Sequence, residues 1–130
     1  MLLSLDYVYL PAPDIDSAVK YYAEALGGEL LWRIRDGETL VAAVKMGDAM
    51  PQVVLANHLA AGEGLLIWRV ESVAATKEAL ASRGWTAETP PFELPQGPCV
   101  VFRDPGGQRL AAYERTRPEA DVKFRGRFDE

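Results

Sequence analysis

The chain is poor in the residue types that form disulfides and catalytic triads, with one cysteine and one histidine among 130 residues. Cys99 has no second cysteine to pair with inside the chain, which excludes an intramolecular disulfide framework and favours a reducing, cytoplasmic setting. The sequence contains no Ser-His-Asp or Cys-His set and no glycine-rich phosphate loop. These absences remove the most common hydrolase and nucleotide-binding chemistries.

Long apolar runs and an excess of basic residues are also missing. The amino-terminal MLLSLDYVYL has no basic region and is too short for a membrane span, so we expect neither a signal peptide nor membrane attachment. Fourteen basic and nineteen acidic residues give a net charge of −5, which argues against nucleic-acid binding. A chain of this length can fold as one domain without covalent staples.

The clearest structural signal is a strand, a turn and a capped helix over residues 5–28. A short run of β-favouring residues ends at Pro11 and Pro13, and Asp14 then stands at an N-cap position. Gly27 and Gly28 predict the end of the helix. The apolar residues at helical spacing are Ile15, Ala18, Val19, Tyr22 and Leu26. This stripe predicts a helix that packs on a sheet.

The remainder repeats that pattern. Strands are expected over residues 29–35, 39–46 and 52–57, then, after a linker at 58–63, over 65–70, 88–94, 99–103 and 109–114, with a second helix over 73–83. The two N-caps, Asp14 and Ser72, lie 72 − 14 = 58 residues apart, as do Tyr7 and Leu65 (65 − 7 = 58). The spacing predicts two βαβββ modules, 1–58 and 64–115.

We therefore predict an α+β fold in which the two modules form an open, cup-shaped mixed β-barrel with the helices outside. Residues 1–115 would be a single domain and 116–130 a carboxyl-terminal arm or tail. Phe124 and Phe128 in this tail would dock on the body or on a second subunit, or the tail would be frayed; the sequence leaves these alternatives open.

Three segments, in order, resemble the vicinal oxygen chelate superfamily, which contains glyoxalases, extradiol dioxygenases, fosfomycin-type resistance enzymes and bleomycin-binding proteins. The resemblance covers about residues 4–115. Its segments are the helix with Asp14, Tyr21-Tyr22 and Leu26-Gly27, the strand Trp68-Arg69-Val70 leading into Ser72-Val73, and the turn DPGGQR at 104–109. The resemblance implies the paired-module fold and a homodimer.

The resemblance also locates a metal centre that this chain has lost. Metal-dependent members bind a divalent ion through a His on the first strand, a His on the fifth and a Glu on the eighth. The matching positions here are Tyr7, Leu65 and Ala111, and the fourth predicted strand offers no acid or histidine. Leucine and alanine do not coordinate metals. We therefore expect neither a metal nor another cofactor.

His58 and Cys99 are the two other reactive side chains to consider. His58 falls in the predicted linker, where a surface histidine needs no functional explanation. Cys99 falls on a predicted buried strand, where a free cysteine behaves as a small hydrophobe. A ligand or base role for His58 and a nucleophilic role for Cys99 are the less favoured alternatives.

Residues two apart on a strand share a face, so the concave side of the cup can be predicted from the three lost ligand positions. Trp32 is expected at the rim of the cup. Such an aromatic and apolar set suits a flat organic ligand, and the alternative is that these side chains fill the space as core. The predicted ligand-binding residues are Tyr7, Tyr9, Trp32, Leu65, Ile67, Arg69, Cys99, Val101, Arg109, Ala111 and Tyr113.

The favoured function is a metal-independent protein that sequesters an aromatic or apolar drug or metabolite, similar to the antibiotic-resistance proteins that bind bleomycin. One rival is a metal-free isomerase, cyclase or lyase that uses Tyr7 or Tyr9 as acid and Arg69 or Arg109 to stabilise an anion. A second is a metal-dependent lyase or dioxygenase whose ligands lie elsewhere. A third is a pairing module with a filled cup and a protein partner.

Overall fold

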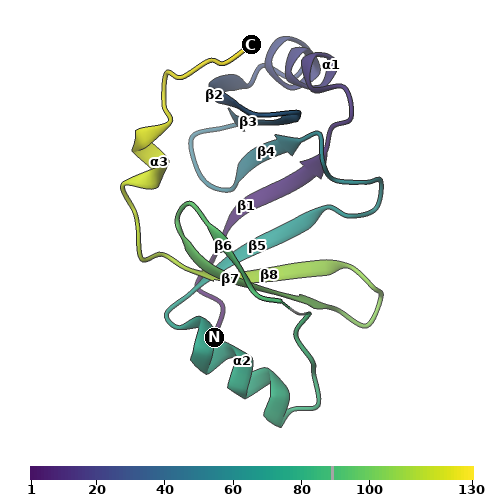
Figure 1. Cartoon of the computed structure of the whole chain (residues 1–130), viewed down its shortest axis with the longest axis vertical. Coiled ribbons are helices and arrows are strands. Elements are labelled where there is room, and N and C mark those ends of the chain that lie inside the picture. Colours follow the sequence, from purple (N-terminus) through teal and green to yellow (C-terminus); the bar gives the residue numbers. More distant parts are fainter. Residues whose placement is uncertain (89) are drawn as a thin grey trace. The chain divides into compact units, whose positions relative to one another are not determined.

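The computed structural model describes residues 1–88 and 90–130 (Figure 1). No helix in these residues has the length and apolar character needed to cross a membrane. The elements are, in order, β1 Ser4–Pro11, α1 Ile15–Lys20, the π-helix η1 Tyr21–Ala25, β2 Glu29–Asp36, β3 Thr39–Lys45, β4 Gln52–Ala56, β5 Leu65–Val70, α2 Val73–Ser82, β6 Phe92–Leu94, β7 Gly97–Arg103, β8 Arg109–Glu114 and α3 Ala120–Lys123.

The chain folds as two compact units. The β1–β4 unit comprises Tyr7–Gly64 with Lys123–Glu130, and the β5–β8 unit comprises Met1–Asp6 with Leu65–Val122. The strand order is β2-β3-β4-β1 in one and β5-β8-β7-β6 in the other. In each unit the first strand pairs in parallel with the last, and the other pairs are antiparallel. The predicted α+β class with two βαβββ modules is confirmed.

In the β1–β4 unit, α1 begins where the sequence predicts. The Asp14 carboxylate accepts a hydrogen bond from the Ser17 amide at 3.1 Å, and the hydrogen bonds from Ser17 lower the pKa of Asp14. Ile15 packs on Leu40, Ala42, Val44 and Leu55, which are buried on β3 and β4. This contact places α1 on one face of its sheet.

The end of this helix differs from the prediction. After Lys20 the chain winds as η1, in which the Leu26 amide donates to the Tyr21 carbonyl five residues earlier. The wider turn shifts the following side chains around the axis, so Leu26 leaves the apolar stripe and is 50% exposed. The prediction that Leu26 belongs to the buried stripe is wrong. Gly27 still ends the helix, with φ at +78°.

Residues 123–130 line the outer edge of β2. The Arg33 amide donates to the Arg127 carbonyl, and the Asp129 amide donates to the Arg33 carbonyl, both at 2.8 Å. The Gly126 amide donates to the Leu31 carbonyl at 3.0 Å. The backbone groups of an edge strand that would otherwise be open are thus paired within the same chain.

In the β5–β8 unit, α2 is capped by Ser72, whose hydroxyl accepts from the Ala75 amide at 3.1 Å. Val73 and Leu80 of this helix pack on one face of the sheet. That face carries Val70, Val100, Phe102 and Ala112. The strand residues between them therefore point to the opposite face.

The strand predicted over 88–94 is shorter in the structure. β6 begins only at Phe92, after the Pro90-Pro91 pair, which supplies no backbone donors, and residue 89 lies outside the described residues. The next strand is longer than predicted, because β7 begins at Gly97 in place of Cys99, and Gly97 pairs with Leu94 across a short hairpin.

Candidate functional site

Eight of the predicted ligand-binding residues share one face of the β5–β8 unit, the face away from α2. The register pairs Ile67 with Ala111 and Arg69 with Tyr113, while Tyr113 also pairs with Cys99 and Ala111 with Val101. Laterally paired residues lie on the same side of a sheet. We call this set the site face of the β5–β8 unit; its members are Leu65, Ile67, Arg69, Cys99, Val101, Arg109, Ala111 and Tyr113.

The site face combines a buried apolar centre with guanidinium groups. Ile67, Cys99, Ala111 and Tyr113 have no exposed surface, and Leu65 and Val101 are buried as well. Arg69 and Arg109 are half-buried. The chemistry available on this face is therefore that of its arginines and of the Tyr113 hydroxyl.

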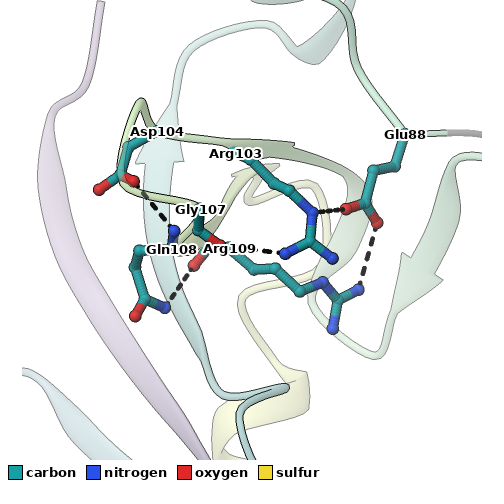
Figure 2. Close-up of polar contacts among 6 residues, drawn as sticks. All are labelled: Glu88, Arg103, Asp104, Gly107, Gln108 and Arg109. Carbon is teal, nitrogen blue, oxygen red and sulfur yellow. Dashed lines mark hydrogen bonds and ion pairs between the residues drawn. The ribbon is translucent and has the colours of Figure 1, made fainter.

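Arg109 belongs to an ion cluster at the β7–β8 hairpin (Figure 2). One Glu88 oxygen lies 3.0 Å from Arg103 Nε, and the other lies 3.4 Å from Arg109 Nη2. Arg103 Nη1 also donates to the Gly107 carbonyl at 3.0 Å. One carboxylate thus offsets two guanidinium groups, and the hairpin holds one of them in place.

The turn that presents these arginines is fixed by its own side chains. Asp104 Oδ1 accepts from the Gln108 amide at 2.9 Å, and Gln108 Nε2 donates to the Arg109 carbonyl at 3.0 Å (Figure 2). The Gly107 amide donates to the Asp104 carbonyl at 3.0 Å. An aspartate that bonds the backbone of its own turn is a frequent way to stabilise a tight reversal.

A second polar group lies where the start of β1 meets the site face. The Tyr113 hydroxyl donates to one Asp6 oxygen, and the Ser4 hydroxyl donates to the other at 2.6 Å. Asp6 is only 5% exposed. A buried carboxylate held by two hydroxyl donors is a strong local constraint, because hydrogen bonds to charged groups are stronger than neutral ones.

The other three predicted residues lie in the β1–β4 unit. The register runs from Tyr9 to Val54 to Ala43 to Trp32, so Tyr9 and Trp32 share one face, and Tyr7 lies two residues before Tyr9. Residues on the alternate positions pack toward α1. Tyr7 is buried, while Tyr9 and Trp32 are partly exposed. The Trp32 ring contacts Phe124, with centroids 5.7 Å apart.

The structure offers no metal centre among the residues it describes: no group of three or more His, Cys, Asp or Glu side chains there is arranged to hold an ion. Tyr7, Leu65 and Ala111 are buried strand residues. His58 is exposed in the turn after β4. The donor set that a divalent metal needs is therefore missing from these positions.

Burial suppresses the reactivity of Cys99. Desolvation raises the pKa of its thiol from 9.0 to about 12. We expect that labelling of the native protein by iodoacetamide at pH 8 will be slow and will become fast only in denaturant. The pKa of the Cys99 thiol is 9.0 in the unfolded chain and about 12 in the folded protein. Raising the pH from 9 toward 12 therefore ionises the thiol only in the unfolded chain, and the contribution of Cys99 to the free energy of unfolding should decrease over this range. Rapid native labelling would contradict the assignment of Cys99 as a core residue.

Sequence comparison identifies the family. Residues 4–112 match the model of the Glyoxalase/Bleomycin resistance protein/Dioxygenase superfamily. This chain belongs to that superfamily. Among curated proteins, none matches the sequence significantly.

Solved structures share the superfamily fold. Methylmalonyl-CoA epimerase from Mycobacterium tuberculosis is 19% identical, with a TM-score of 0.74, 92% of this chain covered and 93% of the other. The Streptomyces coelicolor epimerase in complex with 2-nitronate-propionyl-CoA is 16% identical, with a TM-score of 0.72 and coverages of 89% and 96%. The 2,3-dioxygenase LapB of a Pseudomonas species is 19% identical, with a TM-score of 0.66 and coverages of 87% and 42%. At these identities the likeness establishes the fold alone.

In this superfamily member, three polar residues that the sequence pattern did not mark form contacts with or around the predicted site residues. Asp6 is bonded to Tyr113, and Glu88 and Arg103 are bonded around Arg109. An acid inside an apolar strand is an available signal for Asp6, because such an acid needs a buried partner. Glu88 carries no such signal, since its partners are 15 and 21 residues away (103 − 88 and 109 − 88).

Proposed function

We propose that this protein is a metal-independent small-molecule-binding protein of the glyoxalase/bleomycin-resistance type. The proposal rests on the residues at the three positions where metal-dependent members have their ligands. These residues are Tyr7, Leu65 and Ala111. A phenol, an alkyl chain and a methyl group favour contact with an organic ligand over coordination of an ion.

The partly exposed aromatic residues indicate the class of ligand. Tyr9 and Trp32 are partly exposed on one face of the β1–β4 unit, and the Phe124 ring contacts Trp32 in a tilted arrangement with an interplanar angle of 57°. Aromatic side chains of this kind bind planar apolar groups by stacking. We infer that the protein sequesters an aromatic or apolar drug or metabolite in the cytoplasm, as a homodimer.

Four measurements test this function. Elemental analysis of the purified protein should find no stoichiometric divalent metal, and a chelator should leave the melting temperature unchanged. A bound metal together with a clear drop in Tm on chelation would instead support a metal-dependent lyase or dioxygenase. A thermal-shift screen of planar natural products and antibiotics should identify stabilising compounds, and light scattering will report the oligomeric state.

A variant pair connects any hit to the proposed site. Trp32→Ala should weaken binding of a stabilising compound by at least about tenfold, which corresponds to the loss of one good stacking contact. Trp85→Ala is the matched control, because Trp85 is 44% exposed beyond the end of α2. Equal affinities in the two variants would remove Trp32 from the site.

A metal-free isomerase, cyclase or lyase is the second candidate. The observation in its favour is the buried Tyr113–Asp6 hydrogen bond beside Arg69 on the site face, which brings an acid, a phenol and a cation into one region. Turnover of a compound found in the binding screen, and its loss in Tyr113→Phe, would favour the enzyme over the binding protein.

A further inference from the structure

The three arginines on the site-face side of β5, β7 and β8 differ in whether they have a counter-ion. Arg103 and Arg109 share Glu88, as Figure 2 shows. Arg69 forms neither an ion pair nor a side-chain hydrogen bond with any residue in the described part of the chain, and its Nε is buried without a partner. Arg69 thus has a charge that the protein leaves uncompensated.

The neighbours of Arg69 on the site face are apolar or already hydrogen-bonded. Its register partner Tyr113 has no exposed surface, and Ile67, two residues earlier on the same face, has none either. The nearby Asp6 carboxylate is already bonded by Ser4 and Tyr113. A half-buried cation beside apolar groups is less well solvated than one on the open surface, so an anionic partner would stabilise it.

Part of the guanidinium remains accessible. Of the Arg69 nitrogens, only Nε is buried without a hydrogen-bond partner. The two terminal nitrogens form no hydrogen bond with a described residue either, but they are not buried. The terminal nitrogens are therefore the donors that a ligand can reach. This is the arrangement in which arginine binds a carboxylate through two parallel hydrogen bonds.

We propose that Arg69 binds the anionic group of a ligand held on the site face of the β5–β8 unit, so that this ligand is an organic acid with an apolar or aromatic body. This inference rests on the proposed binding function and narrows its ligand class. Arg109 is less suited to the role, because Glu88 already offsets part of its charge. Arg69 is the site-face cation for which a ligand would supply the missing carboxylate.

The test uses a matched pair of probes, 2-naphthoic acid and its neutral amide 2-naphthamide, with calorimetry on the full chain. Wild type should bind the acid at least about tenfold more tightly than the amide, and the preference should decrease at high salt. Arg69→Gln should abolish the preference by weakening acid binding alone. Arg69→Lys, which keeps the charge but loses the planar fork, should restore it in part.

Arg83→Gln is the control for lost positive charge, because Arg83 is exposed at the end of α2 and outside the site face. It should keep the wild-type preference for the acid. Equal binding of the acid and the amide by wild type, or an acid preference that survives in Arg69→Gln, would overturn the inference and leave the binding function intact. Failure of every compound in the wider screen, charged or neutral, would overturn the binding function itself.

Discussion

Replacing Gly97 by alanine should lower the free energy of unfolding by roughly 3–5 kcal/mol, in the range reserved for severe core or backbone defects. A Cβ at this position would lie 1.8 Å from the Glu114 carbonyl oxygen. Gly97 also has φ at +154°, a backbone conformation that residues with side chains rarely adopt. To avoid this contact, the β6–β7 hairpin would have to move away from β8. That movement would disturb the site face, because β7 and β8 both contribute residues to it.

Urea denaturation followed by circular dichroism measures this loss, with Gly106→Ala as the control. A Cβ on Gly106 would meet only the Asp104 carboxylate, at an ordinary contact distance of 3.4 Å. That variant should stay within about 0.5 kcal/mol of wild type, as surface substitutions usually do. Similar unfolding midpoints for the two variants would show that the hairpin adjusts without strain.

Asp6→Ala and Tyr113→Phe should each cost roughly 1.5–3 kcal/mol, because each removes a hydrogen bond to a charged and buried acceptor. Asp6 is 5% exposed and Tyr113 fully buried, so water does not replace the lost partner. The double variant should cost clearly less than the sum of the two single variants, since either single substitution already removes the Tyr113–Asp6 hydrogen bond.

The double-mutant cycle is measured by chemical denaturation, with Ser4→Ala as a comparison. Ser4 donates to the other Asp6 oxygen and is only partly buried, so its removal should cost less. Strict additivity of Asp6→Ala and Tyr113→Phe would mean that the bond between them contributes nothing to stability. That result would also weaken the enzyme alternative, which relies on this pair.

The fold could be predicted from short sequence signals such as helix N-caps and turn residues. Asp14 and Ser72 cap their helices as the sequence indicates, and Asp36-Gly37 closes the β2–β3 hairpin with Gly37 at a φ of +62°. These features depend on neighbouring residues only. The π-turn at Tyr21–Ala25 was missed because an α-helix and a π-helix of five residues share the same propensities, and the choice between them depends on packing.

For the candidate site, strand parity predicted which side chains share a face but not what they bond to. It placed Arg69 and Arg109 on one side of the β5–β8 sheet, as the register shows. Parity does not distinguish them, although one has Glu88 as a partner and the other has none. That difference arises from a segment before β6 that folds back onto the hairpin, a contact without periodicity in the sequence.

The division of the chain into its two units also affects the order of folding during synthesis. The β1–β4 unit is built from residues 7–64 but includes 123–130, which leave the ribosome more than fifty residues later. Until then the edge of β2 lacks its backbone partners and is open to pairing with other nascent chains. Residues 1–6 wait in the same way for the β5–β8 unit. The β1–β4 unit therefore completes its structure only after the whole of the β5–β8 unit has been translated.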